Sequence, residues 1–137
     1  MRDYRIGNYG LAQAYAAVIG IVLVIVGLLG FISNPIVGEE DAIFVTGAVH
    51  NIVHLVTGAL ALYIAFGLSG EAQANGVIGL GVLYALLFVL LLLSPSLFGI
   101  LQYNVNAADH ALHAVLAVLS LAVGYLARGS ASPVAAR

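Results

Sequence analysis

The sequence has no cysteine and no lysine, and only 7% of its 137 residues are charged. Without cysteine there are no disulfides, thiolate metal sites or cysteine nucleophiles. A net charge of −2 leaves no basic patch, so we expect no nucleic-acid partner. A soluble domain carries about 25% charged residues, and this chain has too few to cover a water-soluble globule. G-x-S-x-G and phosphate-loop motifs are also missing, and the apolar spans contain no carboxylate pair, so we expect no enzyme.

Long apolar runs take the place of these features, and 63% of the residues are hydrophobic. Four runs approach or exceed the roughly 20 residues that a helix needs to cross a bilayer. Lipid leaves open backbone groups unsatisfied and no barrel-like alternation is present, so these runs predict helices. We therefore predict one all-α domain over residues 1–137, an integral membrane four-helix bundle that is multi-pass in the cell membrane. The predicted spans are 11–32, 42–68, 76–93 and 107–127, followed by a tail at 128–137.

The charged residues predict how the bundle is oriented. The first loop carries three acidic residues at 39–41, whereas every basic residue lies in a tail. These basic residues are Arg2, Arg5, Arg128 and Arg137. Because positive charge is retained in the cytoplasm, we predict cytoplasmic N- and C-termini, with the first and third loops outside.

Polar residues in the second and fourth spans form two stripes. The stretch AVHNIVHLVTG at 48–58 places His50 and His54 four residues apart, on one helix face. Aligning residues 49–62 with 108–121 pairs His54 with His113, which indicates two pseudo-repeated helical hairpins. His54 and His113 then lie at matching depth, about 10 Å below the outer edge of the hydrocarbon. We predict that the two stripes face each other. The predicted polar cluster comprises His50, Asn51, His54, Asn106, Asp109, His110 and His113.

Three hypotheses account for such a cluster. The first is structural: His54 bonds to Asn106 or His110, and His113 bonds to Asn51 or Thr57, which links the second and fourth spans.

The second hypothesis is a metal site, because four imidazoles suit zinc, copper or nickel. Its ligands would be His50, His54, His110 and His113, with Asp109 and the acids at 39–41 as outer carboxylates or an entry funnel.

The third hypothesis is haem b, held by His54 and His113 as axial ligands.

A transporter, by contrast, would need a polar path that continues inward. Thr57, Ser120 and Gln13 are the candidates for such a path. We expect a non-enzymatic protein in which the cluster stabilises the bundle and whose role is structural or that of an accessory subunit of a membrane assembly. The alternative is a membrane protein that binds a metal ion or haem through this cluster. Its expected partners are the lipid bilayer and either further copies of itself or other membrane subunits.

Two motifs resemble those of the DUF4383 family of small bacterial and archaeal membrane proteins. The form H-N-x-x-H-L-x-x-G is matched at His50, Asn51, His54, Leu55 and Gly58, and the form N-T-A-D-N-x-L-H at Asn106, Ala108, Asp109, Leu112 and His113. The chain departs from the second form at Ala107 and at His110, where the family tends to have Thr and Asn. The resemblance implies a four-span fold and supplies no reaction. It also implies that a four-histidine metal site would be particular to this chain.

Overall fold

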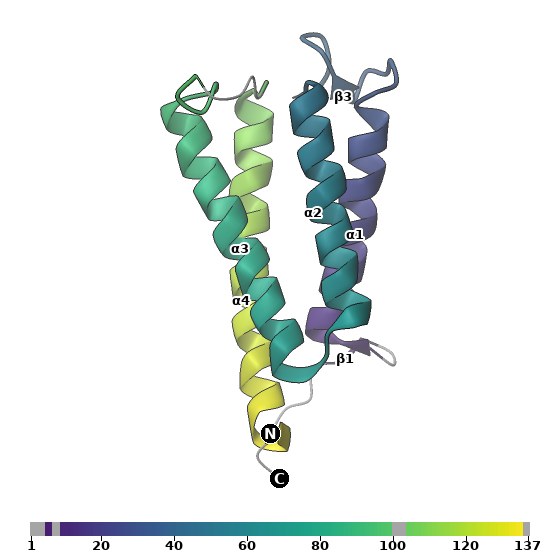
Figure 1. Ribbon diagram of the computed structural model, residues 1–137, viewed down its shortest axis with the longest axis vertical. Helices are drawn as coiled ribbons and strands as arrows, with labels where there is room; N and C mark the ends of the chain where they lie inside the picture. The colour runs from purple at the N-terminus through teal and green to yellow at the C-terminus, as the bar shows by residue number, and fades with distance from the viewer. Residues whose placement is uncertain (1–4, 7–8, 100–103, 136–137) are drawn as a thin grey trace.

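The computed structural model describes residues 5–6, 9–99 and 104–135, with side chains described for residues 10–99 and 104–129. Four long helices dominate this part of the chain (Figure 1). They are α1 (Leu11–Leu29), α2 (Ala48–Gly67), α3 (Gly70–Leu93) and α4 (Ala107–Ala135). The short strands are β1 (Arg5–Ile6), β2 (Tyr9–Gly10), β3 (Val37–Gly38) and β4 (Phe44–Val45), where β1–β2 pair antiparallel and β3–β4 pair parallel. The predicted all-α four-helix bundle is confirmed.

All four helices are long and apolar enough to cross a bilayer. At most 44% of any of their most apolar 18-residue windows is buried inside the protein. On α1, for example, Val18, Ile21 and Ile25 are each more than half exposed. Side chains of this kind cannot face water over such an area, whereas hydrocarbon accepts them. The chain is therefore a multi-pass membrane protein.

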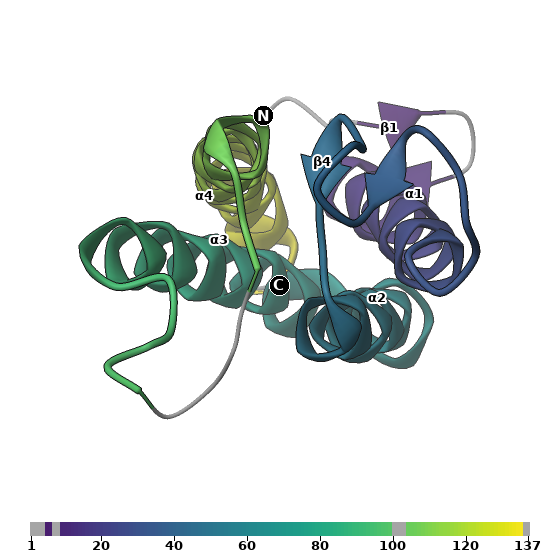
Figure 2. The same ribbon diagram turned by 90° about the horizontal axis from the view of Figure 1, so that it is seen from above.

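The helices form two hairpins, α1–α2 and α3–α4, and the helices within each hairpin pack closely against one another. Figure 1 shows α2 and α3 converging where they connect and diverging toward the opposite end, so the hairpins are splayed. We call the end where α1 begins and α4 stops the terminal end. The opposite end, which carries the α1–α2 and α3–α4 connections, is called the loop end. Figure 2 shows the two hairpins side by side from the loop end.

Glycines bring the two helices of each hairpin together, as expected from glycine in membrane spans. A Cβ on Gly20 would lie 3.0 Å from the carbonyl oxygen of Gly58, and a Cβ on Gly58 would lie 3.0 Å from that of Gly20. In the second hairpin, a Cβ on Gly81 would lie 2.9 Å from the backbone nitrogen of Leu121. Both hairpins therefore depend on backbone-to-backbone approach that a larger residue prevents.

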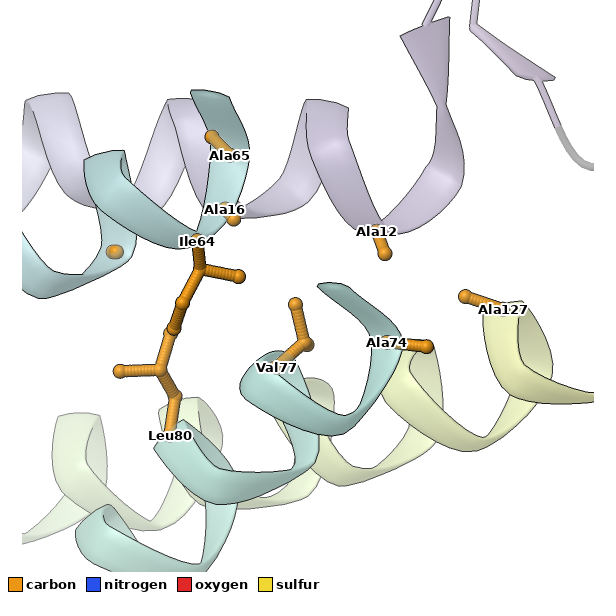
Figure 3. Packing of buried hydrophobic residues seen from close by; sticks show 9 residues of the cluster. Ala12, Ala16, Ile64, Ala65, Ala74, Val77, Leu80 and Ala127 are labelled. Carbon is orange, nitrogen blue, oxygen red and sulfur yellow. The ribbon is translucent and has the colours of Figure 1, made fainter. Parts of the chain in front are cut away.

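Small side chains also join the hairpins at the terminal end (Figure 3). Ala16, Ala65 and Ala74 come from three different helices, and each is 0% exposed. We call this group the alanine cluster, and Ile64, Val77 and Leu80 complete its contacts. Its full membership is Ala12, Ala16, Ala61, Ile64, Ala65, Ala74, Val77, Leu80 and Ala127.

The first connection is more structured than the hydropathy pattern predicts. Helix α1 ends at Leu29 rather than at residue 32. The side chain of Asn34 donates to the carbonyl oxygen of Leu29 at 2.9 Å. Helix α2 begins at Ala48 rather than at residue 42, because residues 44–45 form β4 against β3. An apolar composition alone does not separate these strand residues from a helix.

The second connection is shorter than predicted, since α3 begins at Gly70 rather than at residue 76. The Gln73 side chain donates to the carbonyl oxygens of Ile64, Ala65 and Leu68 at 2.9–3.1 Å. It thereby satisfies the carbonyl groups left open where α2 ends. Glu71 lies in the first turn of α3, and its carboxylate is 3.5 Å from Arg128 Nε.

Helix α4 continues to Ala135, so the predicted tail at 128–137 is helical over most of its length. Among the residues whose side chains are described, the stretch Ala107–Gly129 is long and apolar enough to cross a membrane, and it begins at the predicted residue 107.

Candidate metal centre

Three histidines from the two hairpins meet between α2 and α4. His50 and His54 lie one turn apart on α2, and His113 lies on α4. The ring centroid of His50 is 4.4 Å from that of His54 and 5.6 Å from that of His113. All three residues are buried, with exposed fractions of 0%, 5% and 2% for His50, His54 and His113. We call these residues the three-histidine cluster.

The ligand atoms of these rings are close enough to share one ion. One nitrogen from each ring can be chosen so that all three lie within 4.8 Å of one another. In a tetrahedral zinc site, Zn–N bonds of about 2.0–2.1 Å place two ligand nitrogens about 3.3 Å apart. Small rotations of the rings therefore bring the three nitrogens into bonding distance of one cation.

The backbone sets the protonation form of His50. Its Nδ1 lies 2.7 Å from the carbonyl oxygen of Asn104. A carbonyl oxygen only accepts, so Nδ1 carries the proton and Nε2 keeps its lone pair in the neutral ring. Metal-binding histidines commonly donate their other ring N–H to a carbonyl in this way.

The other two rings have unsatisfied nitrogens. Among the described residues, Nδ1 of His54 and Nδ1 of His113 are buried and have no hydrogen-bond partner. The cross-links expected by the structural hypothesis are not formed with Thr57 or Asn106, which bond elsewhere. The Thr57 hydroxyl bonds to the Val53 carbonyl oxygen and to Tyr84, and the Asn106 amide donates to the Ile43 carbonyl oxygen.

A buried tyrosine that the sequence analysis did not single out lies beside the cluster. The Tyr84 ring is 5.8 Å from the His113 ring, and its hydroxyl is 2.9 Å from Thr57 Oγ1. Nearer the terminal end, the Tyr15 hydroxyl bonds to Ser120 Oγ at 2.6 Å. The only available signal was that a tyrosine buried in a membrane helix needs a partner for its hydroxyl. Gln13, a candidate for a polar path, instead donates to the Ala65 carbonyl oxygen.

Asn106 and Asp109 build the start of α4 rather than a ring of ligands. The Asn106 side chain accepts from the Asp109 amide, and Asp109 Oδ2 accepts from the Asn106 amide, which is a capping box. Asp109 Oδ2 also accepts from the Val45 amide at 3.1 Å. The carboxylate of Asp109 therefore docks β4 of one hairpin onto α4 of the other.

The remaining predicted residues are not part of the group of three ligand nitrogens within 4.8 Å of one another. His110 packs edge-on against Phe88, with ring centroids 6.5 Å apart. Asn51 is buried against Gly30, the residue that follows α1, and its side chain occupies the space that a Cβ on Gly30 would take. The structure thus gathers three of the four predicted imidazoles and leaves His110 outside.

Comparison with known proteins adds a family and no closer relative. The family described as "Domain of unknown function (DUF4383)" matches residues 13–126. No curated protein and no solved structure matches the chain.

Proposed function

The chain belongs to the DUF4383 family, and we propose that it is a non-enzymatic membrane protein that binds one transition-metal ion between its two hairpins. The ligands are His50, His54 and His113. These are the three histidines that match the motifs quoted above for the family, whereas His110 departs from them. The observation that carries the proposal is the convergence of three buried ligand nitrogens within 4.8 Å of one another.

The unsatisfied ring nitrogens favour a ligand over a purely structural cluster. A polar atom buried without a partner costs about 1–3 kcal/mol, and proteins rarely leave several such atoms together. Two of the three rings carry one, at His54 Nδ1 and His113 Nδ1. A bound ion would give lone pairs of this kind a partner.

The third ring favours a bare ion over haem. A haem between His54 and His113 requires a flat slot with one axial histidine on each side. The ring of His50 lies 4.4 Å from that of His54 and 5.6 Å from that of His113, which crowds such a slot. Three imidazoles around one point instead resemble the three-nitrogen ligand sets of zinc, with copper and nickel also suited to imidazole.

The residues between the cluster and the terminal end favour a protein that holds an ion over one that transports it. Thr57 and Ser120 are each bonded to a tyrosine, and the alanine cluster fills the interface toward the terminal end. An ion that left the imidazoles in that direction would find no further charged ligand among the buried residues described there. We therefore place the site in a storage, sensing or structural role within the cell membrane.

Metal titration of the purified, chelator-stripped protein tests this function. Zn²⁺ is added in excess, and the unbound ions are removed by desalting. Elemental analysis is then expected to find one bound Zn²⁺ per chain. Co²⁺ in its place is expected to show the visible absorption of a site with low coordination number. His54→Ala and His113→Ala each remove a ligand and are expected to weaken binding by more than the 10–100-fold typical of losing a second-shell partner.

His110→Asn is the matched control, because it removes a histidine from α4 outside the cluster. This variant is expected to bind Zn²⁺ as the unchanged protein does. A wild-type protein that retains no metal, or a His110→Asn variant as impaired as His113→Ala, would refute the proposed function.

A further inference from the structure

A pocket opens at the loop end, next to the three-histidine cluster. It has a volume of about 740 Å³ and is lined by Glu39, Glu40 and Asp41 on one side. The α3–α4 connection lines the other side with Pro95, Ser96 and Asn104. Three acidic residues therefore line one side of a hollow at the loop end, where the described part of the chain has no arginine or lysine.

Residues that line this pocket also contact the three-histidine cluster. Thr46, Gly47 and Asn104 line the pocket. The Asn104 carbonyl oxygen holds His50 Nδ1, and its side-chain amide lies 2.8 Å from the position of a Cβ on Gly47. Asn104 thus lines the acidic pocket and also contacts the ring of His50 in the three-histidine cluster.

An unsatisfied hydroxyl belongs to the floor of this pocket. Thr46 is 1% exposed, and its Oγ1 has no hydrogen-bond partner among the described residues. Its backbone is fixed, because the Thr46 amide donates to the Gly38 carbonyl oxygen. A buried oxygen held in this position is suited to contact a cation on its way between the carboxylates and the rings.

We infer that this pocket is the entry vestibule through which a divalent metal cation reaches the three-histidine cluster. Glu39, Glu40 and Asp41 attract the hydrated cation, and Thr46 Oγ1 contacts it at the floor beside Asn104. The inference rests on the proposed function. The three carboxylates set the rate at which the cation enters rather than the affinity of the final site, because none of them lies among the three imidazoles.

Rapid mixing with Co²⁺ tests the vestibule in neutral detergent at low ionic strength. Electrostatic focusing by like-charged side chains raises association rates by about 10–10³-fold. The combined variant Glu39→Gln, Glu40→Gln and Asp41→Asn is expected to bind Co²⁺ at least tenfold more slowly while still reaching one ion per chain. Its rate is also expected to lose most of its dependence on salt. Thr46→Val, which keeps the shape and removes the hydroxyl, is expected to slow entry without changing the salt dependence.

Glu71→Gln is the matched control, because it removes a carboxylate from the terminal end. It is expected to leave the association rate unchanged. Equal rates for the combined variant and the wild type at low salt would overturn the vestibule while leaving the metal site standing. A wild-type protein that binds no Co²⁺ at equilibrium overturns both.

Discussion

The two ends of the interface between the hairpins are built by different physical interactions. At the terminal end, alanines such as Ala16, Ala65 and Ala74 let the helices approach closely, and the Gln73 side chain there is fully paired with carbonyl oxygens of α2. At the loop end, the hairpins are splayed, and the contacts are imidazoles, a carboxylate and backbone amides. The comparison indicates that the terminal end is complete without a ligand, whereas the loop end has buried polar atoms still to satisfy. Such a bundle can keep its terminal end fixed while its loop end changes when a ligand binds.

The largest expected effect comes from breaking the packed end. Ala65→Leu inserts three carbons where the side chain is 0% exposed, and overpacking of this kind costs about 1–3 kcal/mol. Ala59→Leu on the same helix is the control, because Ala59 is exposed and is expected to tolerate the larger side chain. Unfolding in mixed micelles measures both. Equal stabilities would contradict the view that close approach of small side chains holds this end.

A smaller effect is expected from breaking the polar end at Asp109. Asp109→Ala removes the acceptor shared by the Val45 and Asn106 amides, which is expected to cost about 1–2 kcal/mol. Asp109→Asn keeps an acceptor oxygen and is expected to lose less. Hydrogen exchange should show both amides deprotected in Asp109→Ala, with the α2–α3 connection unchanged. Loss of protection at that connection as well would mean that the two ends are not independent.

The smallest effect is expected at Tyr84, between the two ends. Tyr84→Phe removes the hydroxyl bonded to Thr57, which still bonds to the Val53 carbonyl oxygen, so about 0.5–1.5 kcal/mol of stability is lost. Tyr63→Phe, at a position 59% exposed, serves as control. Because Tyr84 is not a ligand, metal stoichiometry is expected to stay at one ion per chain. A variant that folds and has lost its metal would show that Tyr84 belongs to the site itself.

Sequence patterns predicted the helices and the facing stripes because both follow from periodicity. Apolar runs of spanning length predict the four helices. The spacing of His50 and His54 places both on one face of the second span, and the alignment places His113 opposite, at the depth of His54. The separation of His110 from the other three could not be predicted, since it depends on which way α4 is rotated beside Phe88.

Side chains that serve the backbone were the least predictable part of the molecule. Gln73, Asn34 and Asp109 satisfy amide or carbonyl groups at helix ends, and their partners are known only once the connections are folded. Asp109 carries a further lesson. Its spacing from Asn106 is that of a capping box, a local signal present in the sequence and interpreted instead as part of a polar cluster.

The three imidazoles are divided two and one between the halves of the chain, with His50 and His54 on α2 and His113 on α4. Under the proposed function, the first hairpin alone would therefore offer a metal ion only two nitrogen ligands as it enters the bilayer. A firm hold requires that the second hairpin has inserted and docked in register. Occupancy of the cluster would in this way distinguish a finished molecule from a half-assembled one.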